Sequence, residues 1–154
     1  MKFKIFMFYF LSFTWGLPFT LFGLIVAIIL RVLGHRSKKF ALVRFFEIGE
    51  SWGGLELGLF FICNQQSTFR IRCHEFGHAI QNCMFGPLMP FIVCIPSAVR
   101  YWYRELRYYE RGKEPKTDYD DIWFEGQATY LGMKFVCDMG GKELTKHHDG
   151  NKIC

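Results

Sequence analysis

The sequence predicts an α+β protein with one N-terminal transmembrane helix and a single small domain behind it. Three observations favour this class: an uncharged apolar run over residues 5–30, two β-rich runs over 42–48 and 55–62, and later segments with helix start and stop signals. A chain of 154 residues allows one domain with a modest core. We expect an anchor with a basic flank over 1–40, the domain over 41–141 and a polar tail over 142–154.

The run over residues 5–30 is long enough, at about 1.5 Å per residue, to cross a hydrocarbon core of about 30 Å. Gly16-Leu17-Pro18 permits a kink in it, or two short re-entrant halves. The run exceeds a signal-peptide core and no cleavage site precedes its charged flank, so we expect an uncleaved anchor. Five basic residues between 31 and 44 outweigh Lys2 and Lys4, which predicts a single-pass membrane protein whose domain faces the cytoplasm.

Composition supports a lipid bilayer as a partner, because 51% of the residues are hydrophobic and 19% are aromatic. Seven of the nineteen basic residues precede the first acidic one, Glu47, which leaves the rest of the chain near neutral. We therefore predict no nucleic-acid partner, since such a partner requires basic residues gathered on the folded part. Arginines and tyrosines over 100–111 leave an RNA or headgroup contact as the minor alternative.

The runs over 42–48 and 55–62 are separated by Gly49 and by Gly53-Gly54 and predict two strands. A helix over about 69–85 follows, with Ser67 or Thr68 as its start signal and Gly86-Pro87 as its stop. Pro87, Pro90 and Pro96 discourage a regular helix over 88–96, so this segment is expected to be a loop. Ser97 then starts a helix over 98–111 whose tyrosines and arginines suit a membrane interface.

The helix over 69–85 contains His74-Glu75-Phe76-Gly77-His78, the H-E-x-x-H pattern of zinc hydrolases. His74 and His78 are four residues apart, so both imidazoles project from one helix face and can bind one Zn²⁺ ion. Two imidazoles leave the ion acidic enough to lower the pKa of water from about 15.7 to about 7, and Glu75 is the candidate general base. The alternative is a surface helix with solvated polar residues, because so short a motif also arises by chance.

A catalytic zinc ion normally has three protein ligands, and Glu125 is the candidate for the third. Asp120 and Asp121 predict the start of a helix over 122–136. Glu125 lies in its first turn among apolar residues, where a carboxylate is costly unless it is paired or bound to a cation. The bland alternative is that Glu125 only complements the helix dipole. His147 and His148 in the tail form a weaker alternative for the third ligand.

H-E-F-G-H followed by E-G-Q-A-T resembles the gluzincin group of zinc peptidases. The resemblance implies a minimal zincin-like domain with a short hairpin or small sheet, the H-E-x-x-H helix, an interfacial helix and a helix that carries the third ligand. It implies His74, His78 and Glu125 as zinc ligands, Glu75 as general base and a cleft-bordering strand that pairs with peptide. Thr129 stands where the family often has an aspartate that supports the first histidine, and its hydroxyl can accept that bond more weakly.

The segment from Cys73 to Pro96 also resembles small membrane-associated H-E-x-x-H proteins of bacteria and their phages. Arg70 and Arg72 precede His74 by a turn or less, so a lipid-buried motif helix is disfavoured. Six cysteines without a C-x-x-C pair disfavour a zinc ribbon, and Cys73 is disfavoured as a nucleophile because adjacent helical residues do not face one another.

These patterns together predict a membrane-anchored, zinc-dependent hydrolase, most simply a metallopeptidase that acts on a peptide or protein substrate. Tyr119 and Tyr130 are both candidates for stabilising the oxyanion. The main alternative is a non-enzymatic membrane protein with a structural metal site. A basic amphipathic module that binds lipid or a partner is the third.

Overall fold

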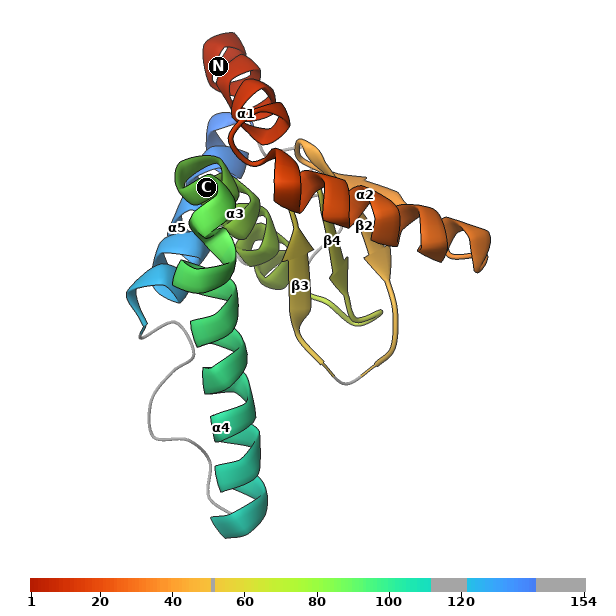
Figure 1. Cartoon of the computed structure of the whole chain (residues 1–154), viewed down its shortest axis with the longest axis vertical. Coiled ribbons are helices and arrows are strands. Elements are labelled where there is room, and N and C mark those ends of the chain that lie inside the picture. Colours follow the sequence, from red (N-terminus) through yellow and green to blue (C-terminus); the bar gives the residue numbers. More distant parts are fainter. Residues whose placement is uncertain (51, 112–121, 141–154) are drawn as a thin grey trace.

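A computed structural model describes residues 1–50, 52–111 and 122–140 of the chain. The described residues form an α+β fold (Figure 1). Its helices are α1 (Lys2–Phe13), α2 (Leu17–Val32), α3 (Phe69–Phe85), α4 (Ile95–Arg111) and α5 (Trp123–Asp138), and its strands are β1 (Lys38–Phe40), β2 (Val43–Glu47), β3 (Gly54–Leu57) and β4 (Phe60–Cys63). The predicted caps Asp120 and Asp121, the oxyanion candidate Tyr119 and the tail with His147 and His148 lie outside the described residues.

The four strands form one mixed sheet in the order β1-β2-β4-β3. β1 pairs with β2 and β3 with β4 in antiparallel fashion, while β2 and β4 are parallel, with Phe45 opposite Phe61. The prediction of one strand over 55–62 is wrong, because this run is a hairpin made of β3 and β4. It turns at Gly58, whose φ of 74° favours glycine and whose N–H donates to the side chain of Glu56.

The predicted single transmembrane helix is wrong. Within 1–50, 52–111 and 122–140, no single helix is both long and apolar enough to cross a bilayer. The run over 5–30 instead belongs to α1 and α2, which meet at an angle of 82°; this bent pair, and a second one formed by 69–88 and 90–104, satisfy the requirement by combined length and composition only. The predicted cytoplasmic orientation depended on a single span and loses that support.

The bend between α1 and α2 has local causes. Gly16 lies against the side chain of Asn82, where a Cβ atom would stand 2.7 Å from the amide nitrogen, and Pro18 lies in the first turn of α2, where a proline is tolerated. Beyond the bend, Gly23 packs on the backbone of Leu57, so that α2 lies across the β3–β4 hairpin. α1 and α2 thus turn to follow the surface of the domain.

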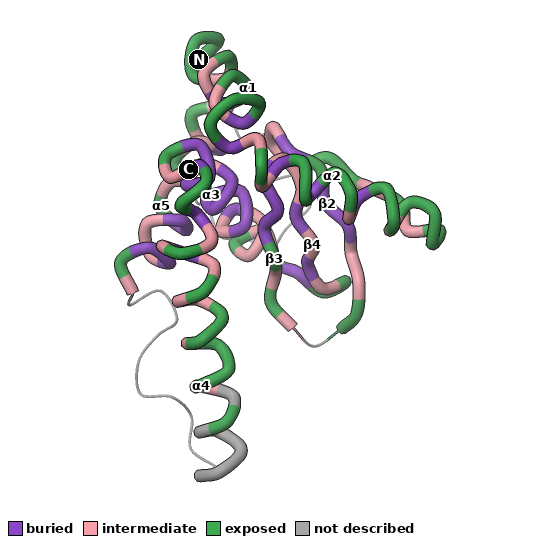
Figure 2. The backbone as a smooth tube through the Cα atoms, viewed as in Figure 1, coloured by how far each residue is buried: buried purple, intermediate pink, exposed green. Residues whose placement is uncertain are grey.

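α3 is the central element of the fold, and it contacts α5 as well as β3 and β4. Figure 2 shows buried positions concentrated on α3 and the strands, and exposed positions along α2 and α4. Buried aromatic rings of α1, the sheet and α3 form the core, among them Phe8, Phe40, Phe61 and Phe76. Thr68 caps α3 by accepting a hydrogen bond from the Ile71 N–H, and the helix ends at Gly86, as the sequence predicts.

The segment predicted as a loop over 88–96 is helical. A 3₁₀ turn (Gly86–Leu88) and a π-helical turn (Pro90–Cys94) lead directly into α4. Pro90 lies at the start of the π-helical turn, a position that needs no intrahelical N–H donor, and Pro96 is the second residue of α4.

Candidate metal centre

The candidate site depends on the close crossing of α3 and α5. A methyl group on Gly77 would collide with the carbonyl oxygen of Ala128, and a methyl group on Gly132 would collide with that of Cys73. The two glycines therefore allow the helix backbones to touch. This approach brings Glu125, in the first turn of α5, next to the histidines of α3.

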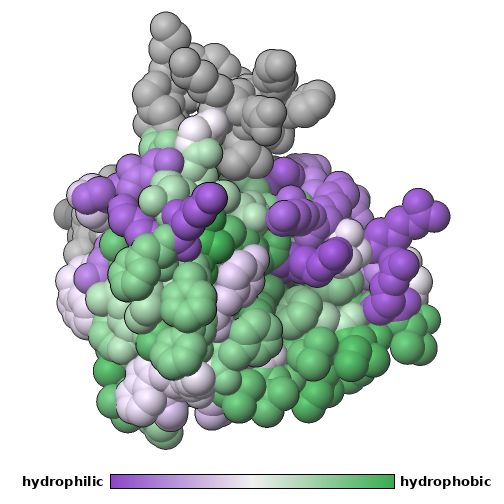
Figure 3. All heavy atoms as spheres, turned by 90° about the horizontal axis from the view of Figure 1, so that it is seen from above, coloured by the Kyte–Doolittle hydropathy of each residue, from purple (hydrophilic) through white to green (hydrophobic). Residues whose placement is uncertain are grey.

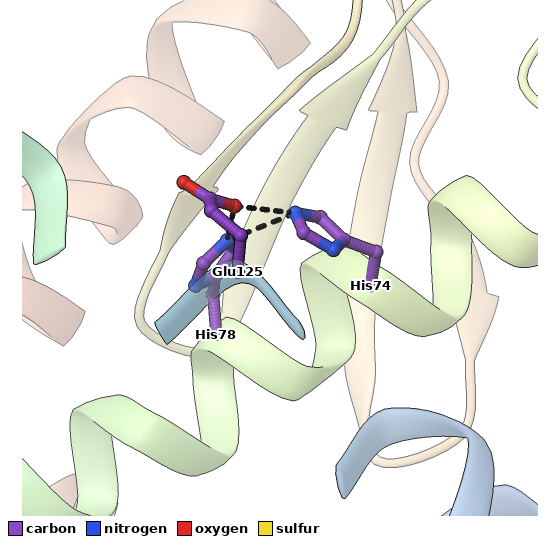
Figure 4. A group of neighbouring side chains, drawn as sticks. All are labelled: His74, His78 and Glu125. Carbon is purple, nitrogen blue, oxygen red and sulfur yellow. Dashed lines mark hydrogen bonds and ion pairs between the residues drawn. The ribbon is translucent and has the colours of Figure 1, made fainter. Parts of the chain in front are cut away.

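Figure 4 shows His74, His78 and Glu125 directed toward one point between the two helices. His74 Nε2 and His78 Nε2 are 3.0 Å apart, and Glu125 Oε2 lies 3.1 Å from the first and 3.2 Å from the second. Tetrahedral zinc with bonds of about 2.0–2.1 Å places neighbouring ligand atoms about 3.3 Å apart. The three atoms are therefore spaced like ligands around one small cation, and the three predicted ligands do lie together.

The other ring nitrogen of His78 is held by Gln81. The side-chain nitrogen of Gln81 donates to the carbonyl oxygen of Phe124 at 2.8 Å and to Gln127 Oε1 at 2.9 Å. Gln81 Oε1 must then accept the bond from His78 Nδ1, which is 2.8 Å away. The proton of His78 is thereby assigned to Nδ1, which leaves the lone pair of Nε2 directed at the site.

Thr129 plays the corresponding part for His74. Its hydroxyl oxygen lies 2.8 Å from His74 Nδ1, as the sequence suggests for this position. Thr129 is one helical turn beyond Glu125, so α5 supplies both the carboxylate and the hydroxyl that fixes the His74 ring. A hydroxyl carries no charge, so it supports the His74 ring more weakly than an aspartate in the same place would.

The electrostatics of the three side chains suit a cation. Glu125 is completely buried; burial alone raises the pKa of its carboxyl, but hydrogen bonds from His74 and His78 outweigh this and lower it below its ordinary value. Burial lowers the pKa of His78, but its bond to Glu125 and the charges of Glu75 and Glu125 outweigh this and raise it to about 9. A buried carboxylate thus faces positive charge, a role that a metal ion fills equally well.

The chain matches no protein-family model, no curated protein and no solved structure. The resemblance to gluzincins therefore stays a prediction that rests on H-E-F-G-H and E-G-Q-A-T. What the molecule can do follows from the chemistry of its own side chains.

Glu75 lies beside the three candidate ligands and is only 4% exposed. Its carboxylate packs against Gly54 of β3, where any added Cβ atom would collide with it. Burial raises the pKa of Glu75 above its ordinary value, while the charges of His74 and His78 oppose the rise. The glycine therefore provides the space in which this carboxyl group reaches the site.

A cavity of about 850 Å³ opens over the site. His74, Glu75 and His78 line it from α3, and residues 52–56, Met89, Val93 and Tyr101 form other walls, so most of its surface is apolar. Tyr130 is absent from this lining, and its hydroxyl instead lies 3.2 Å from the Lys134 ammonium. Of the two tyrosines that the sequence suggests for an oxyanion, the described one thus lies away from the cavity.

Glu56 is a cavity residue that the sequence analysis missed. It is 4% exposed, and its Oε2 atom has no hydrogen-bond partner within the described part of the chain. Burial raises the pKa of Glu56 well above its ordinary value, while His78 and the Gly58 N–H act against this rise. The available signal was a lone glutamate inside the apolar run Leu55-Glu56-Leu57.

Cys73, beside His74 in the sequence, is completely buried where α3 and α5 cross. Burial raises the pKa of its thiol to about 12. A nucleophilic role needs an accessible thiolate, so Cys73 serves as a small packing residue at the crossing.

Proposed function

We propose that the chain is a zinc-dependent hydrolase, and specifically a peptidase. The observation that carries the proposal is the meeting of His74, His78 and Glu125 from two helices, with donor atoms 3.0 to 3.2 Å apart, beside the carboxyl group of Glu75. All three donor atoms are of the types that Zn²⁺ takes in hydrolases, and the cavity leaves the site open on one side. A purely structural zinc site is closed by four protein ligands.

When bound, zinc supplies a Lewis acid that makes water a better nucleophile and polarises a carbonyl group. Glu75 accepts a proton from the attacking water on a carboxylate oxygen, while the water oxygen bonds to the carbonyl carbon of the substrate. The same carboxyl group then gives the proton to the amide nitrogen as the carbon–nitrogen bond breaks. Gln81 and Thr129 keep the histidine rings oriented throughout.

An extended peptide is favoured as the substrate because β3 borders the cavity and ends the sheet order. A chain that adds to β3 would pair through its backbone and pass over Glu75, which touches Gly54 of that strand. The apolar walls of the cavity suit apolar side chains on the substrate.

The deciding experiment measures bound zinc and hydrolysis of a quenched fluorescent peptide library by the purified full chain. Wild type and Glu75→Gln should each hold about one zinc ion, whereas Glu75→Gln should lose turnover by about 10²-fold or more because its proton acceptor is gone. His78→Ala should lose both zinc and turnover. The matched control is Glu50→Gln, because Glu50 is exposed and does not line the cavity, and it should behave as wild type.

A chain that binds no zinc, or a Glu75→Gln variant that keeps full turnover, would refute the proposal. Zinc in the wild type without hydrolysis of any library member would instead favour the non-enzymatic alternative, in which the same three ligands serve only to join α3 to α5.

A further inference from the structure

Helices α1 and α2 carry a large exposed apolar surface. Nine of their aromatic and aliphatic side chains are each more than half exposed, among them Phe6, Phe10, Phe22, Ile25, Ile28 and Ile29. The surface continues from α2 through the turns over 86–94 to α4. Phe91 in the π-helical turn and Val99 in α4 are each more than 60% exposed. Figure 3, seen from above, shows hydrophobic atoms gathered along one side of the molecule, with most of the strongly hydrophilic atoms on the other side.

The opposite face of α2 is already occupied by the protein. Its buried residues Thr20, Gly23 and Ala27 lie toward the β3–β4 hairpin, and Gly23 touches the backbone of Leu57. A helix that is apolar all round needs an apolar environment on every side. For α2 the domain supplies one side, so a second apolar phase must meet the other while the helix lies parallel to the protein surface.

The charges around this surface identify the second phase. Lys2 at the start of α1 and Arg31, Arg36 and Lys39 at and after the end of α2 are exposed, and no acidic residue precedes Glu47. A basic rim around an apolar face is complementary to an anionic lipid surface. Two copies of the chain placed face to face would instead bring these basic rims together. Trp15, half exposed at the bend, is of the residue type that gathers at membrane interfaces.

We propose that α1, α2 and the beginning of α4 bind a lipid bilayer in the plane of its surface, with their exposed apolar side chains in one leaflet and the basic residues at its headgroups. This attachment needs no membrane-spanning helix. It is also independent of the metal centre, whose ligands lie on α3 and α5.

The test is flotation of the purified full chain with vesicles of phosphatidylcholine, with and without about 30% phosphatidylglycerol. Wild type should float with both, more completely with the anionic vesicles at low salt. The double variant Ile25→Ser with Ile29→Ser should bind at least tenfold more weakly. The matched control is Trp123→Ser with Tyr130→Ser, which removes two exposed apolar residues from α5, outside this surface, and should float as wild type does.

Failure of wild type to float, or equal flotation of the two double variants, would overturn the proposal. A wild-type dimer in lipid-free buffer that is lost in the Ile25→Ser, Ile29→Ser variant, without any flotation, would overturn it in favour of a second copy as the occupant. Glu75→Gln should float as wild type, so a failure of the peptidase proposal leaves this result interpretable.

Discussion

Gln81 links the orientation of the His78 ring to α5. One end of its amide accepts from His78 and the other donates to the backbone of Phe124 and to Gln127, so the ring cannot turn without breaking contacts to the second helix. Gln81 therefore matters to the candidate site, although it lies far from Glu125 in the sequence.

We expect Gln81→Ala to lower zinc affinity by about 10- to 100-fold, because the bond that orients a histidine ligand is lost. Competition with a chromophoric chelator measures this affinity. The control is Gln66→Ala, which removes an exposed amide of the same kind. Unchanged affinity in Gln81→Ala would show that His78 is oriented by other contacts.

Glu56 predicts an unusual dependence of stability on pH. Its pKa is raised in the folded state, chiefly by burial, so the folded protein holds a proton that the unfolded chain releases near its ordinary value. The contribution of Glu56 to stability is therefore complete below about pH 4.5 and is lost as pH rises through the raised folded pKa. Within that window the loss is about 1.4 kcal/mol per pH unit for one group.

Glu56→Gln removes this proton linkage and should stabilise the metal-free protein increasingly as pH rises above about 4.5. Urea unfolding of wild type and variant in chelator, at several pH values, measures the difference. Glu50→Gln changes an exposed carboxyl and should give a curve parallel to wild type. A Glu56→Gln variant that is equally destabilised at every pH would show that Glu56 has the same pKa in the folded and the unfolded chain.

At the scale of elements, the crossing of α3 and α5 governs both packing and chemistry. An alanine usually favours a helix over glycine by about 1 kcal/mol, but a methyl group on Gly132 meets the backbone of Cys73, which cannot move aside as a side chain can. The cost of this overpacking, about 1–3 kcal/mol or more, should therefore outweigh the gain in helix propensity.

We therefore expect Gly132→Ala to lower the free energy of unfolding by about 1–3 kcal/mol and to weaken zinc binding at the same time, because the helices must separate. Thermal unfolding and zinc competition measure the two effects. Gly53→Ala is the control, since nothing lies within 4 Å of a Cβ atom there. Loss of stability with full zinc affinity would show that the helices separate elsewhere than at the site.

The elements differ in how well the sequence predicts them. α3 has clear end signals in Thr68 and Gly86, and its bounds follow from them. The sequence predicts one strand where β3 and β4 form a hairpin, because Leu55 to Ile62 is apolar apart from Glu56 and only Gly58 marks the turn. The parallel pairing of β2 with β4 depends on contacts beyond the hairpin, which periodicity does not encode.

The site was more predictable than the fold around it. His74, Glu75 and His78 share a short helical motif, and Glu125 stands out as a carboxylate in an apolar turn. Gln81 and Glu56 were missed in their roles because neither belongs to the motif: one acts through the crossing of α3 with α5, and the other reaches the cavity from a strand.

At the scale of the whole molecule, hydropathy misled because it does not say what covers an apolar helix. The run over 5–30 is as apolar as a span, but the protein covers one face of α2 and the chain turns by 82° at its first glycine. Hydropathy averaged along the chain records neither the bend nor the covered face.

Removal of the bound metal should lower the stability of the whole fold. Zinc at 100 to 1,000 times its dissociation constant should stabilise the fold by about 2.7 to 4.1 kcal/mol, because it binds only where α3 and α5 meet. A chelator should lower the unfolding temperature by several degrees, reversibly on adding zinc, as differential scanning calorimetry can show. His78→Ala should be insensitive to chelator; if it responds as wild type does, zinc is held elsewhere.

Gly54 places Glu75, the proposed proton acceptor, against the backbone of an edge strand rather than against a side-chain pocket. A polypeptide aligned on that strand would be gripped through groups that every amino acid possesses. The choice of substrate by the proposed peptidase would then depend mainly on which polypeptides reach the site. The place of the molecule in the cell would therefore decide its substrates.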